Sequence, residues 1–182
     1  VGSIYPVSIG QITPAIDPIP TGAGFTWDFS MLQPTSQEVD TFLSVTSTGT
    51  TYAFYFIDVA FNSNRSNLAI KGGTLPTIPG LPISISDVFS FYYKSTQEFK
   101  QTGYGATING IGVPVGFDNK DRIYNFPLDF GDTDSCFSDF EISLSGLGYY
   151  GHEQTRLSEV DGWGTLITPY GTFDVLRVRS EI

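Results

Sequence analysis

The stretch from 160 to 179 reads VDGWGTLITPYGTFDVLRVR and decides the class of fold. Aromatic and β-branched residues, which favour strands, fill most of it. Pro169-Tyr170-Gly171 interrupts them with the residue types of a tight turn. The stretch therefore predicts two short strands joined by a turn. A further turn is expected at Asp161-Gly162, because glycine accepts positive φ without strain.

The second of these strands, from 173 to 179, ends in alternating apolar and basic side chains. Successive side chains of a strand point to opposite faces. We therefore expect Leu176 and Val178 in the core and Arg177 and Arg179 on the other face. The chain has nineteen acidic residues against nine basic ones, so both arginines should find carboxylates.

A separate stretch, CFSDFEISL at 136–144, has a clear period of two. The side chains predicted to face inward are Cys136, Ser138, Phe140, Ile142 and Leu144. Those predicted to face outward are Phe137, Asp139, Glu141 and Ser143. This alternation is typical of a strand with one buried face.

The stretch TYAFYFIDVAF at 51–61 is apolar or aromatic at almost every position. It predicts a central strand that is buried on both faces for much of its length. Its alternate residues Ala53, Tyr55, Ile57, Val59 and Phe61 form the more consistently apolar face, and Tyr55, Ile57 and Val59 are expected in the core.

Further strands are expected at 68–70, 88–94, near 99, at 122–126 and at 155–160. Gly103-Tyr104-Gly105 is expected to end the strand that contains Phe99, and the Gly-rich residues 106–119 are expected to be irregular, as are residues 74–87. Residues 1–36 hold five prolines, which favours edge or loop structure over a central strand.

Nine or ten short strands with turns between them, and no long helical period, indicate an all-β protein. The predicted architecture is a two-sheet antiparallel β-sandwich, jelly-roll-like, with a closed β-barrel as the alternative. A length of 182 residues fits a single β domain over 1–182.

The net charge of −10 excludes several partners. Nucleic-acid binding needs a basic stripe, and docking on anionic lipid needs basic clusters, so neither is expected. No run of 18 apolar residues is present, so no membrane insertion is expected. The single cysteine, Cys136, allows no intrachain disulfide.

The inventory for catalysis is small. The only histidine, His152, lies in a predicted Gly-Tyr-Tyr-Gly-His loop without a serine elbow, and together with Cys136 it gives too few ligands for zinc. Asp139 and Glu141 share one strand face and would suit a carboxylate-dependent glycoside hydrolase. Acidic strand faces are common in solvent, so the sequence favours a protein that is not an enzyme.

Two kinds of ligand site remain. Asp129, Asp132 and Asp134 supply the oxygen ligands that Ca²⁺ prefers, although the same residues are ordinary turn formers and no other cofactor is indicated. Tyrosine and tryptophan near loops can stack on sugar rings, or pack in the core as most aromatics do. The candidates for glycan binding are Trp27, Tyr149, Tyr150, Trp163 and Tyr170.

Four motifs also carry a family resemblance. They are TWDFSMLQP at 26–34, PISISDVFSFYYK at 82–94, FPLDFGDTDS at 126–135 and DGWG at 161–164. In this order the chain resembles N-terminal β domains of Bacteroidetes proteins exported by the type IX secretion system. The resemblance implies a secreted or outer-surface location and a longer parent protein from which this domain is excised, and it carries no catalytic residues.

The sequence thus favours a non-catalytic binding or spacer module of a secreted or cell-surface bacterial protein. Its expected partners are extracellular polysaccharide or other domains of the parent chain. The alternatives are the glycoside hydrolase and a lipocalin-like barrel that encloses a small hydrophobic molecule.

Overall fold

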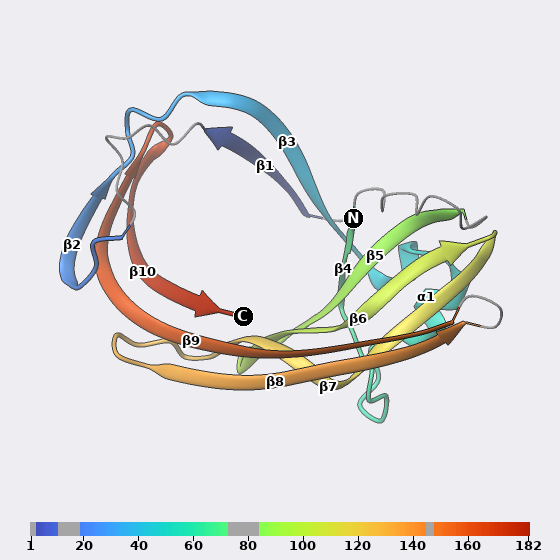
Figure 1. Cartoon of the computed structure of the whole chain (residues 1–182). Coiled ribbons are helices and arrows are strands. Elements are labelled where there is room, and N and C mark those ends of the chain that lie inside the picture. Colours follow the sequence, from blue (N-terminus) through green and yellow to red (C-terminus); the bar gives the residue numbers. More distant parts are fainter. Residues whose placement is uncertain (1–2, 11–18, 73–83, 145–147) are drawn as a thin grey trace. The chain divides into compact units, whose positions relative to one another are not determined.

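A computed structural model describes residues 3–10, 19–72, 84–144 and 148–182 (Figure 1). The described residues form ten strands, one short α-helix and one 3-10 turn, which confirms the all-β class. The elements are β1 (Ser3–Gly10), β2 (Ala23–Asp28), β3 (Pro34–Leu43), η1 (Val45–Ser47), α1 (Thr50–Tyr55), β4 (Leu68–Lys71), β5 (Ile85–Lys94), β6 (Glu98–Ile108), β7 (Ile111–Asn125), β8 (Thr133–Leu144), β9 (Gly148–Thr168) and β10 (Gly171–Glu181).

The strands pair in the order β1-β3-β4-β5-β6-β7-β8-β9-β10, and β2 pairs with β9 outside this path. Strand β7 joins two series of ladders, because it pairs with β6 on one side and, at Asn119 opposite Asp139, with β8 on the other. The ladders between β3 and β8 and the β9–β10 ladder are antiparallel, whereas β2 runs parallel to β9. The order is an open path, so the described strands fit the predicted sandwich and do not close into the alternative barrel.

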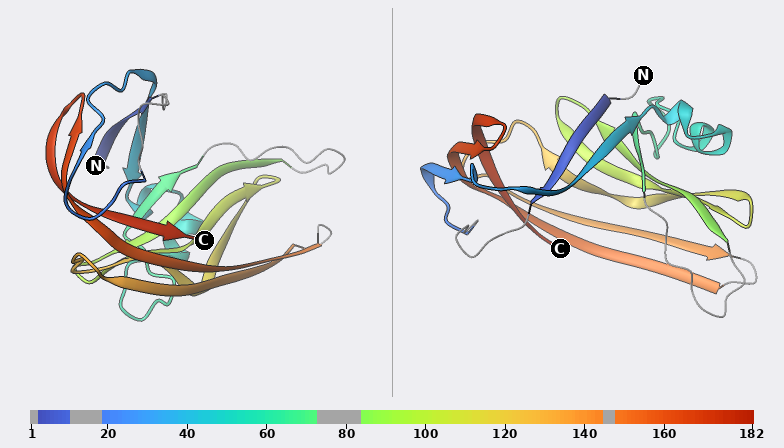
Figure 2. Two further views of the ribbon diagram at one scale, coloured as in Figure 1. Left: turned by 60° about the vertical axis from the view of Figure 1, so that its left-hand side comes forward. Right: turned by 90° about the horizontal axis from the view of Figure 1, so that it is seen from above.

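Contacts divide the chain into two compact units, each assembled from three segments. Unit 1 comprises Val1–Ile4, Thr41–Phe126 and Cys136–Arg156, and unit 2 comprises Tyr5–Asp40, Pro127–Ser135 and Leu157–Ile182. Strands β1, β3, β8 and β9 contribute residues to both units. Figure 2 shows β8 and β9 running beside each other along much of their length.

The core of unit 1 is aromatic and lies where α1 covers β4, β5 and β6. Tyr52 and Phe56 are four residues apart, so both point to the same side of the helical turn. The Phe56 ring stacks on Phe91 at 3.9 Å between centroids, and both side chains are fully buried. Phe89 and Ala69 complete the cluster with Val45.

The strand predicted over 51–61 is therefore wrong. Residues 50–55 form α1, and Tyr55 and Ile57, expected in the core, are 37% and 44% exposed, while Val59 is half-buried. Apolar residues at nearly every position fit both a period of two and a period of 3.6. The buried pair Tyr52 and Phe56 satisfies the helical period.

The glycines of β6 do not end the strand, contrary to the prediction for 103–105. They lie inside it because the helix side chains pack directly on its backbone. A Cβ at Gly103 would lie 2.9 Å from the Phe56 ring and 2.2 Å from the Val115 carbonyl oxygen, and one at Gly105 would lie 2.8 Å from the Tyr52 ring. Glycine here serves close packing of a helix on a strand.

The irregular stretch predicted over 106–119 is mostly strand, because β6 turns directly into β7. The turn is Asn109-Gly110, with φ values of 49° and 81°. Two-residue hairpin loops favour the Asn-Gly pair, so this dipeptide indicates a hairpin between β6 and β7. Of the stretch 74–87, also predicted irregular, residues 85–87 belong to β5 and residues 74–83 lie outside the described residues.

The alternation predicted for 136–144 is confirmed in β8. Ser138 and Phe140 are buried, Cys136 and Ile142 are half-buried, and Phe137 is exposed. The side chain of Leu144 lies outside the described part of the chain. The strands expected at 68–70 and 88–94 are also confirmed as β4 and β5, with Phe89 and Phe91 buried on one face. The N-terminal strand β1 takes an end of the sheet order, as the prolines of residues 1–36, among them Pro6 of β1, predict.

The turn predicted at Asp161-Gly162 is a β-bulge inside the continuous strand β9. Arg177 of β10 pairs with Gly162 and Val178 pairs with Val160, so Asp161 is the extra residue. Bulges keep a strand continuous while increasing its local twist. The turn predicted near Tyr170 is confirmed, since Pro169 and Tyr170 connect β9 to β10.

The prediction that Leu176 of β10 faces the core is wrong, because its side chain is 42% exposed. Val178, predicted on the same face, is half-buried. The extra residue Asp161 of β9 shifts the pairing register between Arg177 and Val178. Both arginines do find carboxylates, as expected from the charge balance: Arg177 pairs with Asp161 and Arg179 with Glu181.

Candidate functional site

Unit 2 holds a shallow open depression around the exposed indole of Trp163. The residues that line it are Gly24, Asp129, Phe130, Trp163, Gly164, Thr165, Asp174, Val175 and Leu176. They come from β2, from the turn before β8, from β9 and from β10. Trp163 is 46% exposed and Phe130 is 49% exposed, so two aromatic faces are open to solvent here.

The ladder between β9 and β10 sets the floor of this depression. Trp163 pairs with Leu176, and Thr165 pairs with Asp174. Residues two apart on a strand share a face, so these four side chains form a two-by-two block on one face of the hairpin. Diagonal neighbours in such a block are within reach of large aromatic side chains. Asp174 is therefore placed to act beside the Trp163 ring.

The two glycines that flank Trp163 let β2 and its tryptophan approach β9. A Cβ on Gly164 would lie 1.9 Å from the carbonyl oxygen of Phe25, and its φ of 152° is one that other residues rarely adopt. A Cβ on Gly162 would lie 3.1 Å from the Trp27 ring. Gly162 and Gly164 of the DGWG motif thus leave room for Trp27 to be buried against β9, whereas Trp163 of the same motif stays exposed.

The turn before β8 brings Asp129 and Phe130 to the same place. It is fixed to β9 by two backbone bonds, in which the Gly131 amide donates to the Val160 carbonyl and the Val160 amide donates to the Asp132 carbonyl. The Asp129 amide donates to the Asp132 carboxylate at 2.8 Å, which closes the turn. These bonds hold Phe130 in position beside the β9 strand.

The chemistry of the depression is that of a surface for rings and hydroxyl groups. Trp163 and Phe130 offer flat apolar faces, and Thr165 offers a hydroxyl. Asp129 and Asp174 are its only charged lining residues, so the site has acceptors and no lining cation within the described residues.

Unit 2 as a whole is strongly acidic. Its segments contain only two basic residues, Arg177 and Arg179, against eleven carboxylates, whereas those of unit 1 contain seven basic and eight acidic residues. Both arginines of unit 2 already pair with acidic side chains. Almost all of the net charge of −10 therefore lies on the unit that carries the depression.

The other aromatics predicted to bind glycan do not share this site. Trp27 is 5% exposed and its indole donates to the Pro20 carbonyl at 2.8 Å, so it is a core residue. Tyr149 and Tyr150 are exposed on unit 1. Tyr170 is exposed at the β9–β10 turn, where its hydroxyl lies 2.8 Å from that of Ser8.

Of the three aspartates proposed to bind calcium, Asp132 and Asp134 accept hydrogen bonds from nearby backbone amides. Asp132 accepts from the Asp129 amide, and the Asp134 carboxylate accepts from the Ser135 amide at 3.0 Å. Among the described residues no group of three or more His, Cys, Asp or Glu side chains converges as a metal site. Of the three, only Asp129 reaches the Trp163 depression.

Unit 1 brings Asp139 and Glu141, the pair considered for a hydrolase, to a second shallow depression with Tyr149 and Glu153. Asp139 accepts from the amide and side chain of Asn119 at 3.0 and 2.9 Å, so it is engaged in the sheet. The hydrogen bond to Glu141 raises the pKa of Tyr149. The Tyr149 hydroxyl therefore has Glu141 as its hydrogen-bond partner.

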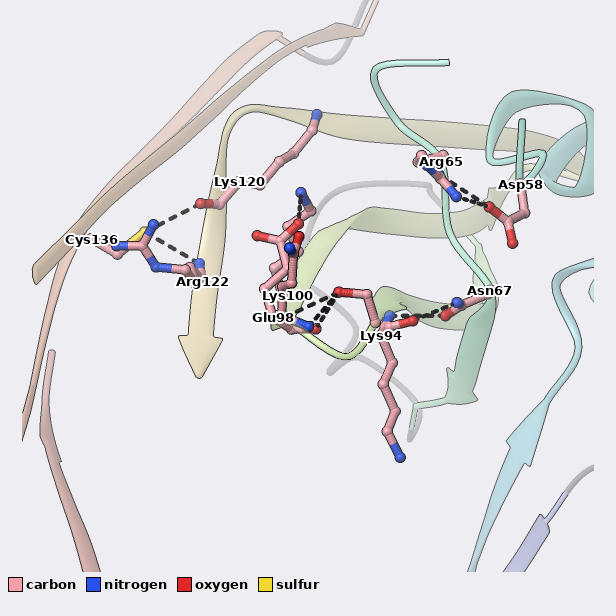
Figure 3. Close-up of polar contacts among 11 residues, drawn as sticks. Asp58, Arg65, Asn67, Lys94, Glu98, Lys100, Lys120, Arg122 and Cys136 are labelled. Carbon is pink, nitrogen blue, oxygen red and sulfur yellow. Dashed lines mark hydrogen bonds and ion pairs between the residues drawn. The ribbon is translucent and has the colours of Figure 1, made fainter. Parts of the chain in front are cut away.

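His152 lies in β9 and not in the predicted loop. Its ring is half-buried, 5.3 Å from the Phe140 ring, and its Nε2 is 3.4 Å from Gln154 Oε1. Cys136 donates to the Lys120 carbonyl at 3.3 Å and accepts from the Arg122 amide at 3.2 Å (Figure 3). Both residues therefore have structural contacts within the sheet of unit 1.

Sequence reasoning missed one buried ion pair in unit 1. Asp121 is 3% exposed and receives two bonds from Arg156, Nε to Oδ1 at 2.9 Å and Nη2 to Oδ2 at 2.7 Å. Gln154 adds a bond to Asp121 at 3.3 Å. The bonds to Asp121 raise the pKa of Arg156. No local pattern signals this pair, because 35 residues separate its partners.

Other cations of unit 1 are held in local contacts (Figure 3). Arg65 donates to Asp58 at 2.8 Å and lies over the Tyr93 ring at 4.3 Å. Lys100 pairs with Glu98 at 2.5 Å. Arg65 and Lys100 therefore stabilise the loop and strand ends around them.

The fold and this site define an all-β domain with an aromatic, acidic surface depression. Comparison with protein-family models, with curated proteins and with solved structures finds no match for the chain. Among the described residues, no helix combines the length and the apolar character needed to cross a membrane.

Proposed function

We propose that the domain is a non-catalytic, glycan-binding module of a secreted or cell-surface bacterial protein, with Trp163 as its main contact. The observation that carries the proposal is the half-exposed Trp163 indole beside Phe130, Thr165 and Asp174. Sugar rings present apolar C–H faces and a rim of hydroxyl groups. A flat aromatic ring with nearby acceptors matches both features.

The way in which Trp163 is held supports this proposal. Large aromatics usually pack in cores, as Trp27 does here. Trp163 instead stays open while three separate segments are bonded into place around it. A pre-formed site of this kind loses little conformational entropy on binding, which favours a recognition role.

The location outside the cell and the association with other domains of a longer parent chain rest on the motif resemblance. The spacer alternative differs from the binding module only in lacking a ligand. A hydrolase is less favoured, because Asp139 is engaged by Asn119 and His152 contacts Phe140 and Gln154. The lipocalin-like alternative would need a closed barrel, and the described strand order is open.

The test is a binding screen against purified polysaccharides, including β-1,4-glucan, chitin, xylan and mannan, by affinity electrophoresis. We expect at least one to retard the protein. Trp163→Ala should weaken that binding about tenfold or more, as expected for an aromatic hot spot. Phe137→Ala is the matched control, because Phe137 is similarly exposed, at 48%, but lies outside the depression.

The screen separates the alternatives. Absence of retardation by every polysaccharide would contradict the glycan proposal and leave the spacer role. Release of reducing sugar would favour the hydrolase. Equal loss of binding in Trp163→Ala and Phe137→Ala would show that the Trp163 depression is not the site.

A further inference from the structure

We infer that the Trp163 depression recognises a cationic amino sugar, that is, a glycan with free amine groups such as a glucosamine oligomer. This inference rests on the proposed glycan-binding function and names the substrate class for the same site. Its basis is the charge that surrounds the site and the identity of the lining side chains.

The long-range field favours a cation. The segments of unit 2 contain eleven carboxylates and two arginines, and both arginines are paired with acidic side chains. A surface of one sign raises the local concentration of ligands of the opposite sign and repels ligands of the same sign. Uronic-acid and sulfated glycans are therefore disfavoured at this site.

The local geometry gives the ammonium group partners. Asp174 lies on the same face of the hairpin as Trp163, two residue pairs along the ladder. Asp129 reaches the same depression from the bonded turn before β8. A sugar ring stacked on Trp163 would thus present its substituents to two carboxylates.

Cation–π attraction adds to this preference. An ammonium group near the face of a tryptophan is attracted by the ring quadrupole, and tryptophan is the best aromatic for this contact. An amino sugar combines the apolar ring face that stacks on Trp163 with the ammonium group that the carboxylates attract. A neutral sugar has only the first of these interactions.

The experiment compares three β-1,4-linked hexamers by isothermal titration calorimetry: glucosamine, N-acetylglucosamine and glucose. They differ only at the 2-substituent, which is an amine, an acetamide or a hydroxyl group. We expect the glucosamine hexamer to bind about fivefold more tightly than the glucose hexamer, the upper range for exposed ion pairs. This advantage should shrink with added salt and as pH rises through the pKa of the sugar amine.

Variants assign the effect to the carboxylates. Asp129→Asn with Asp174→Asn should remove the advantage of the glucosamine hexamer over the glucose hexamer. Glu153→Gln, which removes an exposed carboxylate from unit 1, should leave the advantage intact. Trp163→Ala should weaken binding of all three hexamers.

Several results would overturn the inference. Equal affinity for the amine and hydroxyl hexamers, or an advantage that persists in the double asparagine variant, would remove the role of charge while leaving glycan binding in place. Binding of another polysaccharide but of none of the three hexamers would do the same. Effective competition by a pentalysine peptide would show recognition of charge without a sugar ring. Binding of no glycan at all would refute both proposals.

Discussion

Individual side chains in this protein take opposite roles according to what flanks them. Trp27 and Trp163 are the two tryptophans, and one is buried while the other is half-exposed. The difference arises from Gly162 and Gly164, whose missing side chains allow the approach of Trp27 and of the β2 backbone. The open face of β9 is thereby left to Trp163.

Gly164→Ala should separate β2 from β9, because its Cβ would lie 1.9 Å from the Phe25 carbonyl oxygen. Gly110→Ala is the matched control, since Gly110 also has positive φ but has open space around its Cβ position. Gly110→Ala should lower the free energy of unfolding by about 1–2 kcal/mol, because of the backbone conformation alone. Gly164→Ala should lower it by about 1–3 kcal/mol more, because the added methyl group overpacks the site. Urea unfolding measures both, and equal costs would contradict the close approach of β2.

The ammonium group of Lys120 should titrate below the ordinary lysine pKa of 10.5. Burial is the largest cause that lowers the pKa of Lys120. The charge of Asp118 raises this pKa, and the charge of Lys100 lowers it. Its ammonium donates to Asn64 Oδ1 at 2.6 Å and to the Phe117 carbonyl, which places it half inside unit 1. NMR titration of the lysine Cε resonances should show one early transition that Lys120→Arg removes.

The sign of the effect on stability follows from linkage. The folded state releases the Lys120 proton at lower pH than the unfolded state, so in that window the unfolded state binds more protons. The contribution of Lys120 to stability should therefore rise with pH between its lowered pKa and the ordinary value of 10.5. A Lys120 resonance that titrates at or above 10.5 would contradict the burial of its ammonium.

At the scale of elements, sequence pattern predicts structure where one period dominates. The 136–144 stretch alternates cleanly and forms β8 as expected, with Ser138 and Phe140 buried. The 51–61 stretch is apolar at both even and odd positions, so its period is ambiguous, and tertiary packing on β5 and β6 selects α1. Hydrophobicity alone identified that core sequence but not its secondary structure.

Substitutions can test which side chains in and next to α1 face the core. Phe56→Ala should cost about 3–5 kcal/mol, because its fully buried ring stacks on Phe91. Phe54→Ala should change stability by less than about 0.5 kcal/mol, since Phe54 is 82% exposed. Urea melts of the two variants compare neighbouring positions of the same type. Similar losses would indicate that residues 50–56 form the strand that the sequence predicts and not a helix.

At the scale of the whole molecule, the candidate site combines positions that no local pattern connects. Trp163 and the turn near Tyr170 could be identified from the stretch 160–179. Gly24 and Asp129 could not be assigned to the same place, because they reach it through the parallel β2–β9 ladder and through backbone bonds to Val160. The aromatic residues proposed from sequence likewise lie at separate places, and only Trp163 lines this site.

The uneven charge of the molecule also depends on the fold. The sequence gives a net charge of −10, but the three segments of unit 2 come from distant parts of the chain. Only their assembly shows that nearly all of this charge belongs to one unit. The acidic surface is therefore a property of tertiary structure, and it sets the kind of ligand that this unit attracts.

The most direct test of the account is fluorescence of the two tryptophans during titration with the polysaccharides of the binding screen. A single-tryptophan form that keeps Trp163, Trp27→Phe, should show an emission change and protection from acrylamide quenching as glycan binds. The form that keeps only the buried Trp27, Trp163→Phe, should show neither. Protection of Trp163 by glycan is the result that the account predicts. Quenching of Trp163 that is unaffected by saturating glycan would contradict it.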